Sequence, residues 1–252
     1  MAGVLHSILE MVEQGATHVG VATDHVIESF RNRLWPGYKT GEGIEPALRA
    51  QFVPLERALE AMGVAVWPMI ELEADDALAS AARAAAADEN VQRVCIWTPD
   101  KDLAQCVRGE RVVQVLRKAR TILDAAGVRA RFGVEPERIA DFLALVGDAA
   151  DGYPGIPGIG RIGAARLIKQ YGALESFPPA VLGQHRERAL LFKDLATLRS
   201  DAPLFETVEA LRWRGPTEAF PAVAVEIGDP RLLARALSAA QNLRRVDHVP
   251  DS

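Results

Sequence analysis

Three groups of acidic residues draw attention because each places its carboxylates within a few positions of one another. The first is Glu73-Ala74-Asp75-Asp76, the second is Asp100-Lys101-Asp102, and the third is Asp148 with Asp151. Carboxylate oxygens are ligands that hard cations such as Mg²⁺ prefer, and two-metal hydrolysis needs several of them to hold ions about 4 Å apart. The three groups supply enough ligands for two ions.

Each group taken singly also has a structural explanation. The first opens an alanine-rich segment, where acids in a first helical turn complement the helix dipole. The second could cap the helix that follows it, and the third could simply form a turn. Three such groups, each near an expected strand or helix end, favour a metal site over three independent caps and turns.

A glycine-rich stretch gives a second kind of signal. It reads Gly155-Ile156-Pro157-Gly158-Ile159-Gly160 and runs into an expected helix. Glycines before a helix let backbone N–H groups approach phosphate oxygens closely, and the helix N-terminus adds favourable polarity. The spacing of Pro-Gly-Ile-Gly to Ala164 and Leu167 matches the helix-hairpin-helix pattern. We therefore favour binding of the DNA backbone here over a purely structural turn.

The elements that must position these residues change in character near residue 135. Before it, β-branched runs of strand length alternate with helical stretches, the former at 19–23, 64–67, 94–97 and 112–116 and the latter at 5–13, 52–62 and 74–87. This alternation predicts an α/β domain with a parallel sheet covered on both faces, whose ligands bind outside the C-terminal strand ends. Asp24 and Asp100 each stand just past a strand, where that rule places chemistry. The later part predicts helices, at 139–146, 161–171, 190–198 and 230–243.

Length and composition exclude several classes of protein. The 252 residues are 49% hydrophobic and 25% charged, an ordinary globular balance. No apolar run approaches the roughly 20 residues that a membrane span needs, and the N-terminus lacks a signal-peptide pattern. We expect a cytoplasmic protein of bacterial type with no membrane partner. Cys95 and Cys106 form no CxxC pattern, which predicts buried thiols.

The net charge of −5 argues at first against a nucleic-acid partner, because phosphate binding favours a basic face. The objection weakens once the acids are located. Eight of the 34 acids belong to the candidate metal site, and without their negative charges the formal net charge becomes +3. Bound divalent cations would neutralise much of that local charge.

Four stretches in one order resemble the bacterial 5′→3′ exonuclease and flap endonuclease family, which includes the 5′-nuclease domain of bacterial repair DNA polymerases. The resemblance covers residue 17 to about residue 204, and its stretches are Glu73-Ala-Asp-Asp-Ala-Leu-Ala, Thr98-Pro-Asp-Lys-Asp-Leu-Ala-Gln, Phe142-Leu-Ala-Leu-Val-Gly-Asp-Ala-Ala-Asp and Pro154-Gly-Ile-Pro-Gly-Ile-Gly. It implies a PIN-like α/β nuclease domain over 1–134, an all-α helix-hairpin-helix module over 135–215 and a C-terminal tail over 216–252. The metal-site acids that it implies are Asp24, Glu73, Asp75, Asp76, Asp100, Asp102, Asp148 and Asp151.

The resemblance also implies contacts to DNA. The segment 30–39 is similar to the family's entry to a helical arch that admits single-stranded 5′ ends. There Lys39 and Arg31 would stabilise charge on the scissile phosphate, Tyr38 would stack on a base, and Arg33 would assist. The alternative is a basic surface loop with one buried aromatic. At the hairpin, K⁺ is a candidate ion, and the DNA-binding residues expected are Gly155, Gly158, Gly160, Arg161 and Lys169.

The sequence departs from the family pattern at its start and at two later positions. Family members begin with a strand that ends in a metal-site aspartate, whereas this chain begins with an expected helix. We therefore expect the functional protein to begin upstream of Met1 with such a strand. An Asn common after the last metal-site Asp is Gly152 here, and a Lys often seen in the hairpin is Ile162.

The function predicted from the sequence is metal-dependent hydrolysis of DNA that carries a 5′ end or flap, in DNA replication and repair. Two ions of Mg²⁺ or Mn²⁺ would activate water and stabilise the leaving 3′ oxygen, leaving a 5′-phosphate and a 3′-hydroxyl. One alternative is a non-catalytic protein that binds DNA structures and lost a metal ligand with its first strand. Another is an RNA-directed nuclease on a related sheet, which the hairpin disfavours.

Overall fold

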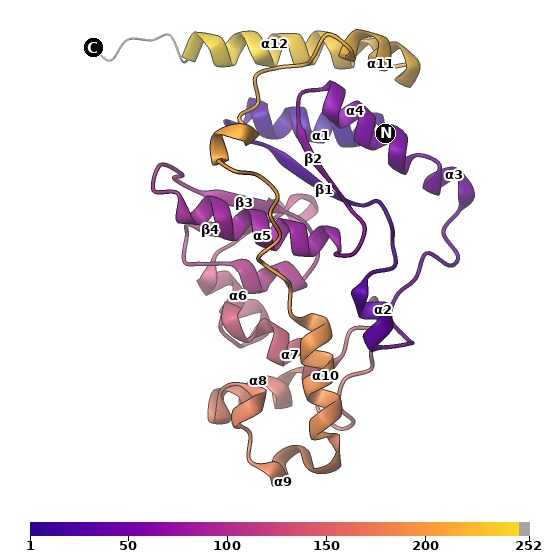
Figure 1. The fold of residues 1–252 in the computed structure, drawn as a ribbon. Helices are drawn as coiled ribbons and strands as arrows, with labels where there is room; N and C mark the ends of the chain where they lie inside the picture. Colours follow the sequence, from indigo (N-terminus) through magenta and orange to yellow (C-terminus); the bar gives the residue numbers. More distant parts are fainter. Residues whose placement is uncertain (247–252) are drawn as a thin grey trace. The chain divides into compact units, whose positions relative to one another are not determined.

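The computed structural model describes residues 1–246, which divide into two compact units (Figure 1). Unit 1 comprises Met1–His25, Glu42–Met69 and the chain from Phe205 onward. Unit 2 comprises Val26–Gly41 and Ile70–Leu204. Both units are discontinuous in sequence. The two units do not coincide with the linear domains expected from the sequence, 1–134, 135–215 and 216–252. The boundaries of those domains remain a prediction.

Unit 1 contains a two-stranded parallel sheet, in which β1 (Gly20–Asp24) pairs with β2 (Ala65–Met69). Its helices are α1 (Ala2–Glu13), α3 (Pro46–Arg49), α4 (Phe52–Ala61), η6 (Val208–Leu211), α11 (Phe220–Ile227) and α12 (Pro230–Val246). Helix α1 contacts α12, and α4 contacts both β2 and α11. The core forms because apolar residues recur every third or fourth position along these helices, as Leu5, Ile8, Leu9 and Val12 do in α1.

The sheet of unit 2 has three strands in the order β3-β4-β5. Strands β3 (Val94–Trp97) and β4 (Val112–Leu116) are parallel, and β5 (Thr121–Leu123) is antiparallel to β4. The sequence predicted a parallel sheet but not the division of its strands into two sheets, and β5 was not predicted because three residues are too short for a visible pattern. Helix α5 (Ala74–Ala87) packs against β3 through its alanines, whose high helix propensity favours it.

The remaining elements of unit 2 are mostly helical. They are α2 (Phe30–Leu34), η1 (Asp102–Cys106), η2 (Arg117–Ala119), α6 (Ala125–Phe132), η3 (Pro136–Arg138), α7 (Ile139–Val146), α8 (Arg161–Tyr171), η4 (Leu174–Ser176), α9 (Pro179–Leu182), η5 (Gly183–His185) and α10 (Arg186–Ala196). Helices α7 and α10 lie side by side (Figure 1), and Phe142 and Phe192 are fully buried in the core that they share. An ion pair between Lys193 and the buried Asp141, at 2.7 Å, also joins the two helices.

Two glycines close the turn between α7 and α8. Gly147 ends α7 with a φ of +87°, and Gly155 has a φ of +72°. A Cβ added to Gly147 would lie 2.4 Å from the carbonyl carbon of Pro154, and one added to Gly155 would lie 2.4 Å from the Gly147 nitrogen. Only glycine can adopt the left-handed backbone at positions 147 and 155 and also allow the two segments of backbone to approach so closely. The turn therefore returns onto the end of α7.

Within residues 1–246, no helix combines the length and the apolar character that crossing a membrane requires. Both cysteines are free thiols. Cys106 is partly buried, but Cys95 is exposed, so the prediction of two buried thiols was wrong for Cys95. Alternate residues of β3 face opposite sides of the sheet, and Cys95 has the outward position.

Candidate metal centre

Three buried carboxylates meet in unit 2. Asp102 lies in η1, and Asp148 and Asp151 lie in the turn after α7, residues 148–153, which we call the acidic turn. One carboxylate oxygen from each of the three lies within 4.8 Å of the other two. The three residues are 4–7% exposed. We call them the acid cluster.

Hydrogen bonds to the backbone fix the two segments that carry the acid cluster. The side chain of Gln114 in β4 donates to the Thr98 carbonyl at 3.1 Å and to the Asp100 carbonyl, which anchors the segment that leads into η1. An oxygen of Asp100 accepts from the Asp102 amide at 3.0 Å. In the acidic turn, the backbones of Asp148 and Tyr153 exchange two hydrogen bonds of 2.8 and 3.0 Å. The cluster is thus held by rigid local geometry.

The electrostatics of the acid cluster favour a bound cation. Burial raises the pKa of Asp102 well above its usual range, and the charges of Asp100, Asp151 and Asp148 raise it further. Burial also raises the pKa of Asp151, against the opposing effect of Lys39. The Oδ1 atom of Asp102 has no hydrogen-bond partner among the described residues. Buried like charges with an unpartnered oxygen fit a divalent cation, which supplies the missing charge and accepts the oxygen as a ligand.

A second acidic group stands at the start of α5. Glu73 accepts from Ser29 Oγ at 2.6 Å, from Arg31 at 3.2 Å and from the Tyr38 hydroxyl at 3.3 Å. Asp76 is fully buried and receives two bonds of 2.7 Å from the guanidinium of Arg31. These carboxylates are therefore neutralised by the protein itself.

Lys39 links the two acidic groups. Its Nζ atom lies 2.9 Å from an oxygen of Glu73 and 3.2 Å from an oxygen of Asp151. Burial lowers the pKa of Lys39, but the two carboxylates outweigh burial and raise it overall, so the side chain is a cation. Lys101 pairs with Asp148 in the same way. Lys101 was not predicted as a site residue, although it stands between two predicted ligands in the sequence.

The loop that carries Lys39 is joined to the acidic turn by close backbone contacts. We call residues 35–39 the Lys39 loop. Trp35 Nε1 donates to the Gly152 carbonyl at 3.0 Å, and the Lys39 amide donates to the Asp151 carbonyl at 3.1 Å. Gly152 has a φ of +84°, and a Cβ added to it would lie 1.9 Å from the Gly37 carbonyl oxygen. Glycine at position 152 therefore allows the two segments to touch.

The structure corrects the roles expected for Arg31 and Tyr38. Arg31 is 1% exposed, and all three guanidinium nitrogens donate to protein acceptors. Tyr38 is 4% exposed and packs in the core of unit 2, so its ring is not available to stack on a base. Tyr38 is thus a buried aromatic in this structure, and the sequence left this open because core aromatics and stacking aromatics look alike in sequence. Arg33 is exposed and pairs with Glu71 at 3.1 Å.

At the hairpin, the glycines divide into two kinds. A Cβ at Gly158 or Gly160 would meet nothing within 4 Å, whereas Gly155 is buried and packed against Gly147. Gly155 thus has a packing role in this turn, and its expected contact with DNA stays a prediction. Lys169 is exposed, and the guanidinium of Arg161 lies over the ring of Phe142, 5.3 Å from its centroid. Ile162, in the first turn of α8, is 88% exposed.

The other predicted ligands lie outside the acid cluster. Asp75 is partly buried beside Asp76, and Asp100 is partly buried near the end of β3. Asp24 ends β1 in unit 1, where the neighbouring Thr23 donates to the buried Glu56 at 2.6 Å. Its role as a metal ligand stays a prediction.

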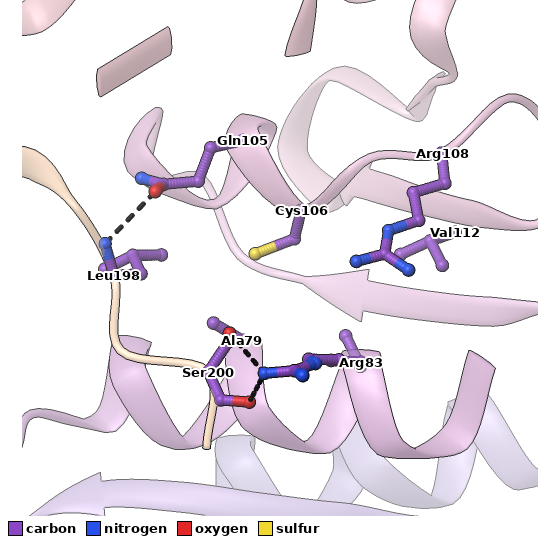
Figure 2. A pocket seen from close by; sticks show the side chains of 9 residues that line it. Ala79, Arg83, Gln105, Cys106, Arg108, Val112, Leu198 and Ser200 are labelled. Carbon is purple, nitrogen blue, oxygen red and sulfur yellow. Dashed lines mark hydrogen bonds between the residues drawn. The ribbon is translucent and has the colours of Figure 1, made fainter. Parts of the chain in front are cut away.

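Two of the cavities among the described residues lie in unit 2. One of about 110 Å³ is drawn in Figure 2, where Arg83 from α5 bonds to Ser200 and Arg108 projects from the opposite wall. Burial raises the pKa of Cys106 in this cavity to about 12, so the thiol is neutral. Two arginines with no acid in the lining do not suit a metal cation. A more open cavity of about 440 Å³ runs along the acidic turn and is lined in part by Tyr153.

Comparison with known proteins identifies both parts of the chain. Residues 1–133 match the family model for the N-terminal resolvase-like domain of 5′-3′ exonucleases, and residues 134–219 match the model for their C-terminal SAM fold. The chain is 32% identical over 220 residues to DNA polymerase I of Bacillus caldotenax, covering 81% of this chain and 25% of that protein. It is 35% identical over 203 residues to flap endonuclease Xni of Edwardsiella ictaluri, covering 76% of this chain and 79% of that protein. The chain thus spans about a quarter of the length of the DNA polymerase I relatives that it matches.

Two solved structures share the fold of this chain. T5 5′-exonuclease with bound zinc ions matches with a TM-score of 0.65 at 17% identity, covering 95% of this chain and 90% of the other. The catalytic core of Rad2 in complex with DNA substrate matches with a TM-score of 0.62 at 14% identity, covering 94% and 83%. At these identities the likeness concerns the fold.

Proposed function

This chain belongs to the 5′-3′ exonuclease family, and on that premise we propose that it is a metal-dependent nuclease that removes 5′ ends or 5′ flaps from DNA. The observation that carries the proposal is the acid cluster, in which Asp102, Asp148 and Asp151 bring carboxylate oxygens within 4.8 Å of one another. The products would be a 5′-phosphate and a 3′-hydroxyl. Relatives that are DNA polymerases and a flap endonuclease support a place in DNA replication or repair inside the cell.

The donor set at the acid cluster suits Mg²⁺ or Mn²⁺. All three ligands are carboxylates, and hard divalent cations prefer oxygen. A cation held there would stabilise negative charge on the phosphate and lower the pKa of water at the site. A second ion would use Glu73 and Asp75, and it would have to compete with Lys39 for Glu73. Filling that second site would therefore move Lys39.

Lys39 is the residue that would act on the scissile phosphate. Its side chain is 27% exposed, whereas the carboxylates that it contacts are nearly buried. A cation that replaced its charge at Glu73 or Asp151 would free the ammonium to contact the phosphate, where a fixed positive charge stabilises the transition state. Arg31 would act indirectly, by orienting Glu73 and Asp76 at the start of α5.

The hairpin would hold the DNA backbone next to this chemistry. Gly158 and Gly160 leave the backbone uncovered at the N-terminus of α8, which has eleven residues. Backbone N–H groups and the helix dipole at such a position favour phosphate oxygens, and K⁺ is the ion proposed to bridge them. Arg161 and Lys169 add positive charge on the same helix. Recognition through phosphates fits an enzyme that selects DNA by its structure.

A cleavage assay on labelled DNA tests the proposal. Wild-type protein should cut a 5′-flap duplex with Mg²⁺ or Mn²⁺ and should stop when EDTA is added in excess. Asp102→Asn with Asp148→Asn should abolish cleavage while duplex binding persists, because repulsion of phosphate is also reduced. Asp201→Asn is the matched control, since Asp201 is exposed in unit 2 and outside the acid cluster.

Three outcomes would contradict the proposal. Cleavage that persists in EDTA would remove the metal from the mechanism. Binding of flap DNA without any cleavage would favour a non-catalytic DNA-binding protein. Faster cleavage of the matched RNA substrate would favour an RNA-directed nuclease.

A further inference from the structure

The hydroxyl of Tyr153 is an unexplained polar group at the edge of the acid cluster. The residue is 1% exposed, and its ring packs against Phe192 with the centroids 5.3 Å apart. The hydroxyl has no hydrogen-bond partner among the described residues. Buried hydroxyls are nearly always bonded, so an unbonded one needs an explanation, and a water or ion that binds there is one.

An antiparallel bridge places Tyr153 opposite Asp148 of the acid cluster, so their side chains leave the same face of the turn. The Tyr153 backbone exchanges two hydrogen bonds with that of Asp148, which ties it to the acidic turn. The negative charges of Asp102, Asp148 and Asp151 all act on the hydroxyl. A phenol carries its proton at neutral pH, so the Tyr153 hydroxyl can donate a hydrogen bond.

A complementary unpartnered atom lies in the same cluster. Asp102 Oδ1 is a buried acceptor that also has no partner among the described residues. The Tyr153 hydroxyl and this acceptor do not bond to each other, and a species held by the acid cluster can accept from the hydroxyl and bind the carboxylate oxygen. A partly hydrated divalent cation meets both needs, because Mg²⁺ takes carboxylate oxygens as ligands and keeps several of its waters.

We propose that the Tyr153 hydroxyl donates a hydrogen bond to a water of hydration of the divalent cation held by Asp102, Asp148 and Asp151. Tyr153 is then a positioning residue, which fixes the orientation of the hydrated ion without contacting the ion itself. The proposal rests on the proposed function, since it needs the metal site. Partners that hydrogen-bond to a metal's ligands typically change metal affinity or activity about 10–100-fold.

Tyr153→Phe tests this role because it removes only the hydroxyl and keeps the ring against Phe192. The matched control is Tyr171→Phe, since the Tyr171 hydroxyl bonds to Gln170 on α8 at 2.9 Å. Binding of Mn²⁺ to the DNA-free protein is measured by the electron paramagnetic resonance signal of free Mn²⁺, and melting temperature is measured in EDTA. We expect Tyr153→Phe to weaken Mn²⁺ binding by about 10–100-fold with an unchanged or higher melting temperature in EDTA. Tyr171→Phe should leave Mn²⁺ binding as in the wild type.

A third variant, Asp102→Asn, distinguishes failure of this inference from failure of the proposed function. If Asp102→Asn abolishes Mn²⁺ binding and Tyr153→Phe does not alter it, the metal site stands and the role of Tyr153 is refuted. If neither variant changes Mn²⁺ binding, the metal site itself is refuted. A lower melting temperature in EDTA for Tyr153→Phe, with Mn²⁺ affinity unchanged, would assign the hydroxyl to packing and overturn the inference.

Discussion

Replacing Gly152 by alanine should disconnect the Lys39 loop from the acidic turn. The new Cβ would start 1.9 Å from the carbonyl oxygen of Gly37, at a backbone φ of +84°. Neither problem can be relieved by turning a side chain, because both partners are backbone. The loop must move away, and the hydrogen bonds from Trp35 and Lys39 to the acidic turn would lengthen or break.

A second glycine offers a control that separates the cost of the left-handed backbone from the cost of the collision. Gly158 has nearly the same φ, +80°, but a Cβ there would meet nothing within 4 Å. Gly158→Ala should therefore cost about 1–2 kcal/mol from the left-handed backbone, less up to about 1 kcal/mol regained through the stiffer unfolded chain. Gly152→Ala adds the collision, for which overpacking typically costs about 1–3 kcal/mol more.

The assay is urea unfolding of each variant in EDTA, followed by circular dichroism, with the free energy of unfolding taken at an unchanged slope. We expect Gly152→Ala to lose roughly 2–4 kcal/mol and Gly158→Ala about 1 kcal/mol, against a typical total of about 5–15 kcal/mol. Cleavage by Gly152→Ala should also need more Mg²⁺, because Asp151 moves with the turn. Equal losses of unfolding free energy in Gly152→Ala and Gly158→Ala would refute the predicted collision between residue 152 and Gly37. A Gly152→Ala protein with normal stability and a normal Mg²⁺ requirement would refute it as well.

Other predictions concern the acids, the lysine and the hairpin. Because the folded-state pKa of Asp102 is raised, its contribution to stability is full below the unfolded pKa and is lost as pH rises through the folded pKa. Asp102→Asn should thus raise the melting temperature in EDTA at pH 7–8 and have less effect toward pH 4. A melting temperature below that of the wild type at pH 8 would contradict the destabilising charge assigned to Asp102. Lys39→Ala should slow single-turnover cleavage by about a hundredfold with little change in DNA affinity, and a change confined to KM would argue for a binding role. Gly158→Val with Gly160→Val should weaken duplex binding at fixed salt and leave Mn²⁺ affinity intact, and unaltered duplex affinity would refute the hairpin assignment.

Local sequence patterns were sufficient to predict the longer helices and four of the strands, whereas short helices such as α2, α3, α6 and α11 were not predicted. Helices α5 and α8 and strands β3 and β4 have the bounds that their apolar periodicity, propensity and flanking glycines predict. The ordered motifs also indicated the family, which the family models confirm over residues 1–219. Patterns of this kind work because the period of an element and its end signals are properties of neighbouring residues. The short strand β5 was missed because three residues carry no period.

Tertiary structure alone decided which candidate side chains face the site. The sequence could not distinguish a stacking Tyr38 from a buried one, or an Arg31 that binds phosphate from one that binds Asp76, because burial depends on residues far away in the chain. It gave no sign that Tyr153 belongs with Asp102, about fifty positions earlier. That association exists because the acidic turn folds back on α7 and places its carboxylates beside η1. Residue types and order thus determine which chemistry is available, whereas packing over long sequence separations determines which groups perform it.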